Sequence, residues 1–295
     1  MKPLVPLFVS LLCGSAIAQE FSGLALEARA EKATYAMSEP VTLTVRASNP
    51  TPTAVMAHAD LSPSYGLLEI HIAASGGDFR RYSGWGWGAR AARPGPVKMA
   101  PGDAIASEVV IFPAHPMRDG GDSPPVATVL DRPGKYRFRV SWANLGFEER
   151  IQAADFEVEI QAPSEEDSVL GKAVSRDPEL AAFLAVGGSD ATAVKAEKLL
   201  QDVGNAAGAG HLALSLGRHY IEARDTKKAE PFLTRALNGP AGSAQKRKAL
   251  LLLVQAGMMQ KDEVRALNLL REAEPDFAGS VDEAVYRAML REIGG

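Results

Sequence analysis

The sequence predicts a two-domain protein in which a β-sandwich is followed by a stack of helical hairpins. Between Phe21 and Ala162 apolar and polar residues alternate, which is the period of strands with one face on a core. From Pro163 onward apolar residues recur every three or four positions, which is the period of packed helices. At 295 residues the chain is long enough for two domains, each with its own core. We therefore expect a multidomain β plus α fold.

The first eighteen residues have the pattern of a secretory signal peptide. Lys2 supplies a positive start, Leu4 to Leu12 form a short apolar core, and residues 16 to 18 form a small-residue cleavage site. The apolar run is too short to span a bilayer, and no later run replaces it. The short, lysine-poor signal looks bacterial. We expect cleavage near Ala18, a periplasmic or secreted mature protein and no stable membrane insertion.

Cysteine content and charge exclude several classes of function. Cys13 lies within the signal, so the mature chain has no thiol for disulfides, metal thiolates or nucleophilic catalysis. The formal net charge is −4, with acids and bases interspersed along both halves. Nucleic-acid partners favour a basic face, so we expect none. The five histidines show no metal-ligand spacing on a common element, and we expect no metal and no cofactor.

The first domain, residues 19–162, contains runs of alternating apolar residues that predict roughly seven short strands. The runs are Leu24-Leu26-Ala28, Val41-Leu43-Val45, Leu68-Ile70-Ile72, Val109-Ile111, Tyr136-Phe138-Val140-Trp142 and Phe156-Val158-Ile160. Turn signals such as Asn49-Pro50 and Pro101-Gly102 separate them, which is typical of a sandwich. Asp131, Gly134 and Tyr136 resemble the tyrosine corner of immunoglobulin-like domains, in which a phenol ties a strand to nearby backbone. The resemblance implies an Ig-like β-sandwich.

The second domain, residues 163–295, is predicted to be helical throughout. Pro163 ends the last strand, and Ser164 with Asp167 predicts a helix N-cap and first turn. Asp177-Pro178 predicts a second helix start. Ser280 and Glu283 predict a capping box for the final helix. The apolar residues of that helix are expected to cover the end of the stack, namely Val281, Ala284, Val285, Ala288 and Met289.

Residues 211–237 predict one well-defined helical hairpin. Leu212, Leu216 and Tyr220 recur at four-residue steps, with Ala213 and Gly217 on the side where a neighbouring backbone would approach. After a turn around Asp225, the second helix places one apolar stripe, formed by Ala229, Phe232, Leu233, Ala236 and Leu237. Leu216-Gly217, Tyr220, Ala229, Leu233 and Ala236 resemble a tetratricopeptide repeat (TPR). That resemblance implies hairpins stacked into a peptide-binding solenoid.

The hairpin pattern recurs imperfectly along the second domain. Ala196 and Leu200 precede Ala229 and Leu233 by 33 positions, close to the 34-residue period of the family it resembles. Downstream the offset is 37, where Asp262, Ala266, Leu270 and Ala273 follow Asp225, Ala229, Leu233 and Ala236. About two and a half degenerate repeats predict a TPR-like α-solenoid. An ordinary helical bundle remains the alternative, since packed helices share this spacing.

A long segment of the first domain, residues 75–102, offers a second candidate site. It carries Tyr82, Trp85 and Trp87 among several arginines, and glycines surround the tryptophans. Indoles beside guanidinium groups stack on sugars or peptides. The alternative is that the aromatic residues fold back over an open end of the sandwich.

The sequence contains no paired acids, triad or phosphate loop, so we expect a non-enzymatic protein. Its predicted function is that of a periplasmic or secreted scaffold that binds a peptide or protein through the helical repeats. The first helices of the hairpins would line the groove, which makes Arg218, His219, Glu222 and Arg224 the candidate contacts. An envelope glycan- or peptide-binding module that uses Tyr82, Trp85 and Trp87 is the alternative, and a hydrolase is a weaker third hypothesis.

Overall fold

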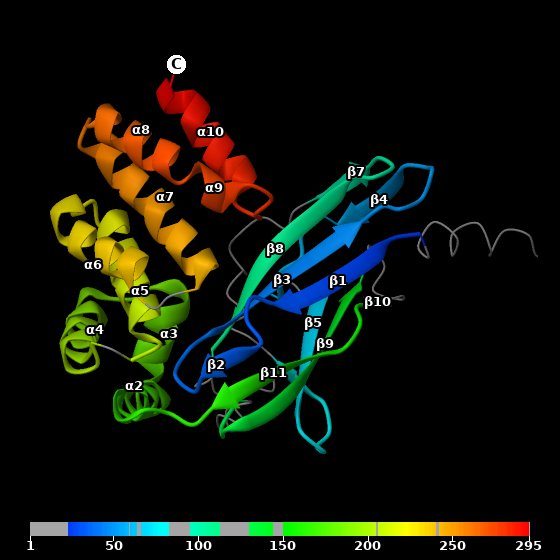
Figure 1. The fold of residues 1–295 in the computed structure, drawn as a ribbon, viewed down its shortest axis with the longest axis horizontal. Coiled ribbons are helices and arrows are strands. Elements are labelled where there is room, and N and C mark those ends of the chain that lie inside the picture. Colours follow the sequence, from blue (N-terminus) through cyan, green and yellow to red (C-terminus); the bar gives the residue numbers. More distant parts are fainter. Residues whose placement is uncertain are drawn as a thin grey trace, which may run out of the picture.

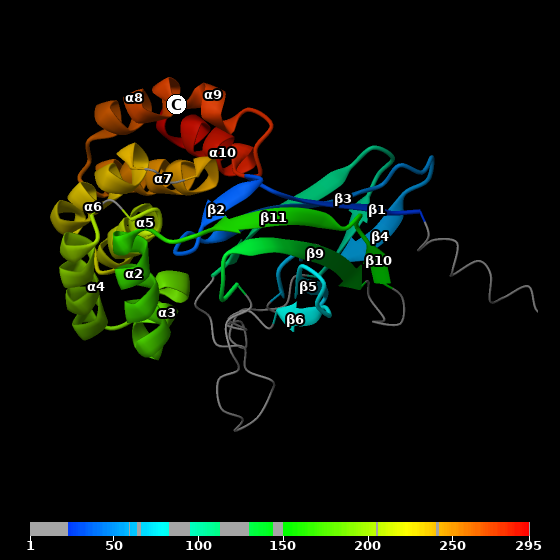
Figure 2. The same ribbon diagram turned by 60° about the horizontal axis from the view of Figure 1, so that its bottom comes forward.

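The computed structural model describes residues 23–58, 60–63, 66–82, 95–112, 130–143, 150–204, 206–239 and 242–294, and for Val186 the backbone alone. The predicted signal peptide and the residues Trp85 and Trp87 lie outside these ranges. The chain is β in its first half and α in its second, and Figures 1 and 2 show the two parts side by side. The predicted mixture of β and α structure is therefore confirmed.

The described residues of the β half form two larger sheets and one strand pair. Its strands are β1 (Ala25–Ala30), β2 (Thr34–Ala36), β3 (Val41–Ser48), β4 (Val55–His58), β5 (Leu68–Ala74), β6 (Arg80–Tyr82), β7 (Pro96–Met99), β8 (Ala104–Ile111), β9 (Gly134–Ala143), β10 (Arg150–Gln152) and β11 (Phe156–Gln161). One sheet has the order β1-β3-β8, and the other has the order β2-β11-β9-β5-β6 with β10 beside β9. β4 pairs with β7, and β2 runs parallel to β11.

Both larger sheets contribute to a single hydrophobic core. Leu43 of β3 and Ile111 of β8 are fully buried with Ile70 of β5 and Phe138 and Val140 of β9. Every alternating run identified in the sequence lies on a strand, except that Leu24 comes one residue before β1, and the shorter strands β2, β4, β6, β7 and β10 were not predicted. Side-chain alternation thus sets which face of each long strand meets the core.

Tyr136 makes the local contact expected from its position near the start of β9. Its hydroxyl donates to the carbonyl of Arg132 at 2.8 Å and accepts from the N–H of the same residue at 3.3 Å. Gly134, between them, has φ of 140°, a backbone conformation that side chains disfavour. The phenol therefore holds the turn before β9 in place.

The helical half follows directly after β11. Its helices are α2 (Glu165–Arg176), α3 (Pro178–Val186), α4 (Asp190–Asp202), α5 (Ala209–Glu222), α6 (Thr226–Asn238), α7 (Ser243–Met259), α8 (Glu263–Glu272), α9 (Glu274–Phe277) and α10 (Glu283–Gly294). Ser164 caps α2 in a complete capping box with Asp167. Asp177 caps α3, with Pro178 in its first turn. These two predicted helix starts are confirmed.

The recurrence at an offset of 37 residues extends to backbone conformation. In the α5–α6 turn Arg224 has φ of 60° and Asp225 caps α6. In the α7–α8 turn Lys261 has φ of 62° and Asp262 caps α8. The predicted small and apolar positions are buried in both hairpins, at Ala229, Leu233 and Ala236 and at Ala266, Leu270 and Ala273. Two consecutive hairpins are therefore built alike.

The last helix differs from its prediction in two ways. The side chain of Glu283 accepts from the N–H of Gly279 at 2.7 Å and Ser280 Oγ has no hydrogen-bond partner among the described residues, so the capping box at Ser280 and Glu283 is wrong. The buried face is also rotated: Tyr286 is buried, whereas Val285 is half exposed. α10 packs through Tyr286, Met289, Leu290 and Ile293, because Phe277 stacks on Tyr286 and fixes the contact face.

Within the described ranges, no helix combines the length and the apolar composition that a bilayer crossing requires.

Candidate functional site

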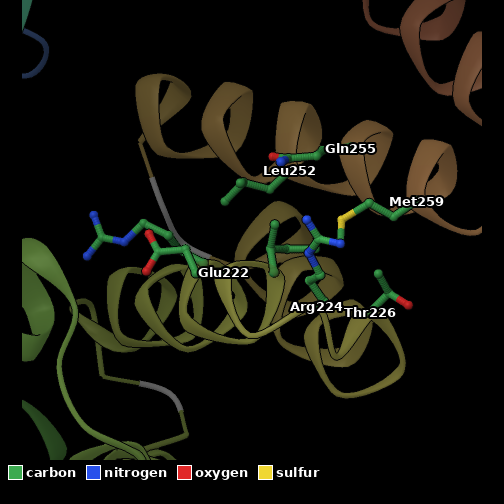
Figure 3. A pocket seen from close by; sticks show the side chains of 8 residues that line it. Glu222, Arg224, Thr226, Leu252, Gln255 and Met259 are labelled. Atoms are coloured by element: carbon green, nitrogen blue, oxygen red, sulfur yellow. The ribbon is translucent and has the colours of Figure 1, made fainter.

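A cleft of about 800 Å³ lies between α5 and α7, beside the α5–α6 turn (Figure 3). Charged, polar and apolar side chains line it: Arg218, Ile221, Glu222, Arg224, Thr226, Leu252, Gln255 and Met259. α5 and α7 are the first helices of consecutive hairpins, so the cleft lies where the sequence predicted a binding groove. Its mixed lining suits a peptide better than a purely apolar ligand.

Three of the four residues proposed for ligand contact lie on the wall of this cleft. They are Arg218 and Glu222, one turn apart on α5, and Arg224 in the turn that follows. Figure 3 shows Glu222 at one end of the cleft and Arg224 with Thr226 and Met259 at the other. The charged groups of the cleft are therefore distributed along its length.

Arg218 is largely enclosed by protein. Its Nη1 donates to the carbonyl of Ala185 at 3.4 Å, while Nε and Nη2 are buried and have no hydrogen-bond partner in the described part of the chain. Burial lowers the pKa of Arg218 below its ordinary value, and the carboxylate of Glu222 opposes that shift. The charge of Glu222, one turn along the same helix, therefore favours the charged form of Arg218.

Arg224 differs from Arg218 in exposure and in backbone conformation. The residue is exposed, and its φ of 60° lies in the left-handed region, where helix-ending turns commonly place glycine. The turn is fixed by a hydrogen bond from the N–H of Asp225 to the carbonyl of Tyr220 at 2.8 Å. A long cation therefore occupies a position where glycine would fit with less strain.

Replacing Arg224 with glycine is expected to stabilise the protein. Relief of the left-handed backbone should raise the free energy of unfolding by about 1 kcal/mol. Lys261→Gly should give a similar gain, because Lys261 has the same conformation in the next hairpin. Urea denaturation followed by circular dichroism measures both. A loss of stability in either variant would show that the side chain contributes more than the strain removes.

His219 does not face the cleft, which corrects its prediction as a ligand contact. It is 7% exposed, packs against Phe183 and Tyr220, and its Nε2 lies 3.1 Å from Asp190 Oδ1. α5 is buried on most of its circumference, so a polar residue on it need not point toward a groove. His211, Ser215 and His219 recur at four-residue steps, and this spacing is the sequence signal for a polar stripe facing α3 and α4.

Tyr82 is also in a different environment from the one its proposed role requires. Its ring is 4% exposed in the core of the β half, and its hydroxyl accepts from the N–H of Phe112 at 3.4 Å. Burial raises the pKa of the phenol well above its ordinary value. The expectation that Tyr82 stacks on a ligand is therefore wrong, because no face of the ring is available. Its proposed partners Trp85 and Trp87 lie outside the described residues.

The sequence did not identify the half of the cleft that α7 supplies. Leu252, Gln255 and Met259 are spaced at i, i+3 and i+7, so they share one face of α7. Their spacing is visible in the sequence. The sequence did not show which part of the chain this face lies opposite, because nothing local to α7 indicates that it faces Arg224.

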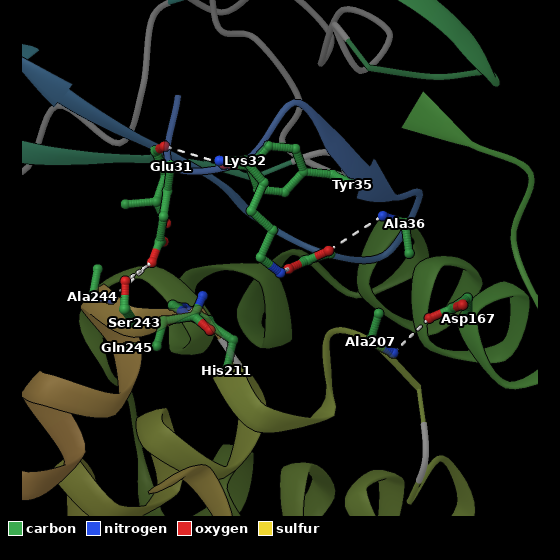
Figure 4. A network of polar contacts seen from close by, with 12 residues as sticks. Glu31, Lys32, Tyr35, Ala36, Asp167, Ala207, His211, Ser243, Ala244 and Gln245 are labelled. Carbon is green, nitrogen blue, oxygen red and sulfur yellow. Dashed lines mark hydrogen bonds and ion pairs between the residues drawn. The ribbon is translucent and has the colours of Figure 1, made fainter. Parts of the chain in front are cut away.

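The β half holds the first turn of α7 through Glu31. The carboxylate of Glu31 accepts from Ser243 Oγ and from the N–H of Ala244, the latter at 3.1 Å (Figure 4). A carboxylate at a helix N-terminus satisfies free N–H groups and is favoured by the helix dipole. Since Gly242 has no side chain, Glu31 acts in place of a capping side chain. One wall of the cleft is thus fixed by the β half.

Further contacts join the two halves at both ends of their junction. Glu108 of β8 accepts from Arg247 Nη2 and lies 3.2 Å from Lys248 Nζ, and Arg247 Nε donates to Asp282 at 3.2 Å. At the other end Asp167 accepts from Ser38 Oγ and from the N–H of Ala207, the latter at 2.8 Å. The carboxylates of Glu31, Glu108 and Asp167 therefore bind the β half to the helices.

His211 also lies at the junction, where its ring contacts Phe112 of the β half as well as the helices. Its Nε2 lies 3.1 Å from the carbonyl of Leu184, its Nδ1 lies 3.2 Å from the Gln245 amide, and Phe112 packs edge-on against its ring. Burial lowers the pKa of His211 to about 4, so the ring is neutral at physiological pH. Among the described residues no group of three or more histidines, cysteines or carboxylates is placed to hold a metal ion.

Comparison with known proteins adds no family. No family model matches the chain, and no curated protein does either. Solved structures give partial matches. A β-glucosidase of Erythrobacter marinus has 14% identity and a TM-score of 0.27, and the match covers 47% of this chain and 15% of that one. A β-glucosidase of Listeria innocua has 14% identity and a TM-score of 0.26, with 47% of this chain and 16% of that one covered, and the sporulation control protein Spo0M of Bacillus subtilis has 12% identity and a TM-score of 0.26, with 52% of this chain and 55% of that one covered. This chain spans less than two thirds of each, and these low scores support no functional inference.

Proposed function

We propose that the protein is a non-enzymatic scaffold, periplasmic or secreted, that binds a segment of a partner protein in the cleft between α5 and α7. The observation that carries the proposal is the cleft itself, whose wall includes Arg218, Glu222 and Arg224. Ligand-binding clefts combine apolar contacts with a few placed polar groups, and this lining has both. The anchored α7 supplies a wall that keeps its position before a ligand arrives.

The same proposal includes a finer assignment of fold. We propose an Ig-like β-sandwich for residues 19–162, supported by the contact of Tyr136 with Arg132. For residues 163–295 we propose a TPR-like solenoid, supported by the matched turns at Arg224 and Lys261 and the matched buried positions of the two hairpins.

Charge reversal at Arg224 is expected to weaken partner capture strongly while leaving the fold intact. Arg224 is exposed, so Arg224→Glu buries no charge, whereas reversal at the enclosed Arg218 would bury a carboxylate. Mature protein from Gln19 onward, immobilised and incubated with an envelope extract, measures capture by quantitative mass spectrometry. We expect Arg224→Glu to reduce the retrieved partner at least tenfold.

Lys261→Glu is the matched control, because it reverses an exposed cation at the equivalent turn outside the cleft. It should retrieve the partner as the wild type does. Equal retrieval by Arg224→Glu and the wild type would contradict the cleft as the binding site.

A further inference from the structure

The cleft is lined by two positive charges and one negative charge, and the two ends of the cleft differ in charge. Arg218, Glu222 and Arg224 are its charged residues. Glu222 exerts its charge on Arg218, at one end of the cleft. Arg224 lies at the other end, and its guanidinium forms no ion pair with any part of the chain that the structure describes. One positive charge therefore remains uncompensated at the Arg224 end.

Other arginines of this chain form bidentate pairs with carboxylates. Arg139 on β9 donates hydrogen bonds to Asp155 from Nε and Nη2, at 3.0 and 2.8 Å. Arg265 on α8 donates to both carboxylate oxygens of Glu230 from its two terminal nitrogens, at 3.0 and 3.1 Å. Planar guanidinium groups match carboxylates in this bidentate way. Arg224 is an exposed guanidinium without such a partner.

Apolar surface lies beside this cation. Met259 is 38% exposed on α7, and Figure 3 shows the Arg224 side chain reaching toward it across the cleft. Leu252, two turns earlier on the same face of α7, also lines the cleft, with Gln255 between them. A ligand that places one group against Arg224 could therefore place an adjacent aliphatic side chain against α7.

We propose that the segment bound in the cleft carries an acidic side chain that pairs with Arg224 and an adjacent aliphatic side chain that packs on Leu252 and Met259. The inference rests on the proposed peptide-binding function and names the class of ligand. Charge complementarity selects the acid, and the exposed thioether of Met259 provides an adaptable apolar contact.

The test uses three pools of fluorescein-labelled nonapeptides with blocked termini and no other charged residue. The central residue is Asp, Asn or Lys, followed in each pool by Leu. Fluorescence anisotropy with the full mature protein measures affinity. We expect the Asp pool to bind at least tenfold more tightly than the Asn pool, with the difference shrinking as salt is raised from about 0.05 to 0.5 M.

Three variants separate the role of Arg224 from a general effect on the fold. Arg224→Gly should bind the Asp and Asn pools equally, and Arg224→Glu should prefer the Lys pool. Lys261→Gly should keep the wild-type preference. Equal binding of the Asp and Asn pools by the wild type, or a preference that survives Arg224→Gly, would overturn this inference while leaving peptide binding in place. Failure of all pools to bind would overturn the proposed function as well.

Discussion

Gly217→Ala is expected to destabilise the protein by about 2 kcal/mol, although alanine is the better helix former. A methyl group at this position of α5 would lie 2.3 Å from Leu233 Cδ2 and 2.5 Å from its Cγ. Leu233 is fully buried on α6, so neighbouring side chains restrict its movement. Overpacking of a core costs about 1–3 kcal/mol, more than the propensity gain of about 1 kcal/mol. Urea denaturation at pH 7 measures the change.

Two further variants test whether that loss arises from the contact between α5 and α6. Gly171→Ala on α2 meets nothing within 4 Å and should stabilise the protein by up to about 1 kcal/mol. Leu233→Ala should cost about 2–5 kcal/mol alone. In that background Gly217→Ala should become neutral or stabilising, because its methyl group enters vacated space. Additive losses in the double variant would contradict the close approach of the two helices.

Asp167→Ala is expected to cost about 3 kcal/mol, because one buried carboxylate joins three segments. Its oxygens accept from Ser164 at the α2 N-cap, from Ser38 of the β half and from the N–H of Ala207 before α5. Removal leaves the partly buried donors of Ser38 and Ala207 without their acceptor, and hydrogen bonds to charged groups contribute about 1.5–3 kcal/mol each. Ser175→Ala, whose hydroxyl bonds only within its own helix, serves as the control.

The effect of Asp167 should depend on pH in a defined direction. Burial acts to raise the pKa of its carboxyl, but the hydrogen bonds from Ser38, Ser164 and Ala207 together lower it below the ordinary value. The charged form is then favoured in the folded state, so its contribution is complete above the unfolded pKa of about 3.9 and is lost on acidification through the folded pKa. The stability gap between wild type and Asp167→Ala should therefore be constant from pH 7 to pH 5 and shrink below about pH 4. A gap that grows with acidification would exclude this role.

Long, regular patterns in the sequence predicted the fold well. Six alternating runs lie on strands, and the small residue Gly217 lies where α6 approaches α5, because period and residue size are local properties. Strands such as β2 and β10 are three residues long and show no alternation to detect. The final helix was placed correctly but its buried face was wrong, since the stacking of Phe277 on Tyr286 is a tertiary contact.

The sequence predicted only the part of the candidate site that lies on α5 and the turn after it, which the hairpin pattern had located. Arg218, Glu222 and Arg224 lie on one wall of the cleft, and the opposite wall depends on how α7 is positioned. Glu31 and Glu108 position α7 from more than a hundred residues away. The prediction for His219 was wrong because α5 contacts α3 and α4 as well as α6 and α7, so α5 has no wide solvent-exposed face. Such long-range placement leaves no trace in local spacing.

Methionine methyl NMR on the full mature protein tests most directly whether the cleft between α5 and α7 binds peptide. Met259 lines the cleft, and Met56, on β4 and 47% exposed, reports on a distant surface in the same spectrum. Met259→Leu and Met56→Leu assign the two signals. On titration with the Asp-centred peptide pool, we expect a saturable shift of the Met259 methyl and none at Met56. An unchanged Met259 signal at peptide concentrations that saturate the anisotropy assay would place binding elsewhere and contradict the cleft as the functional site.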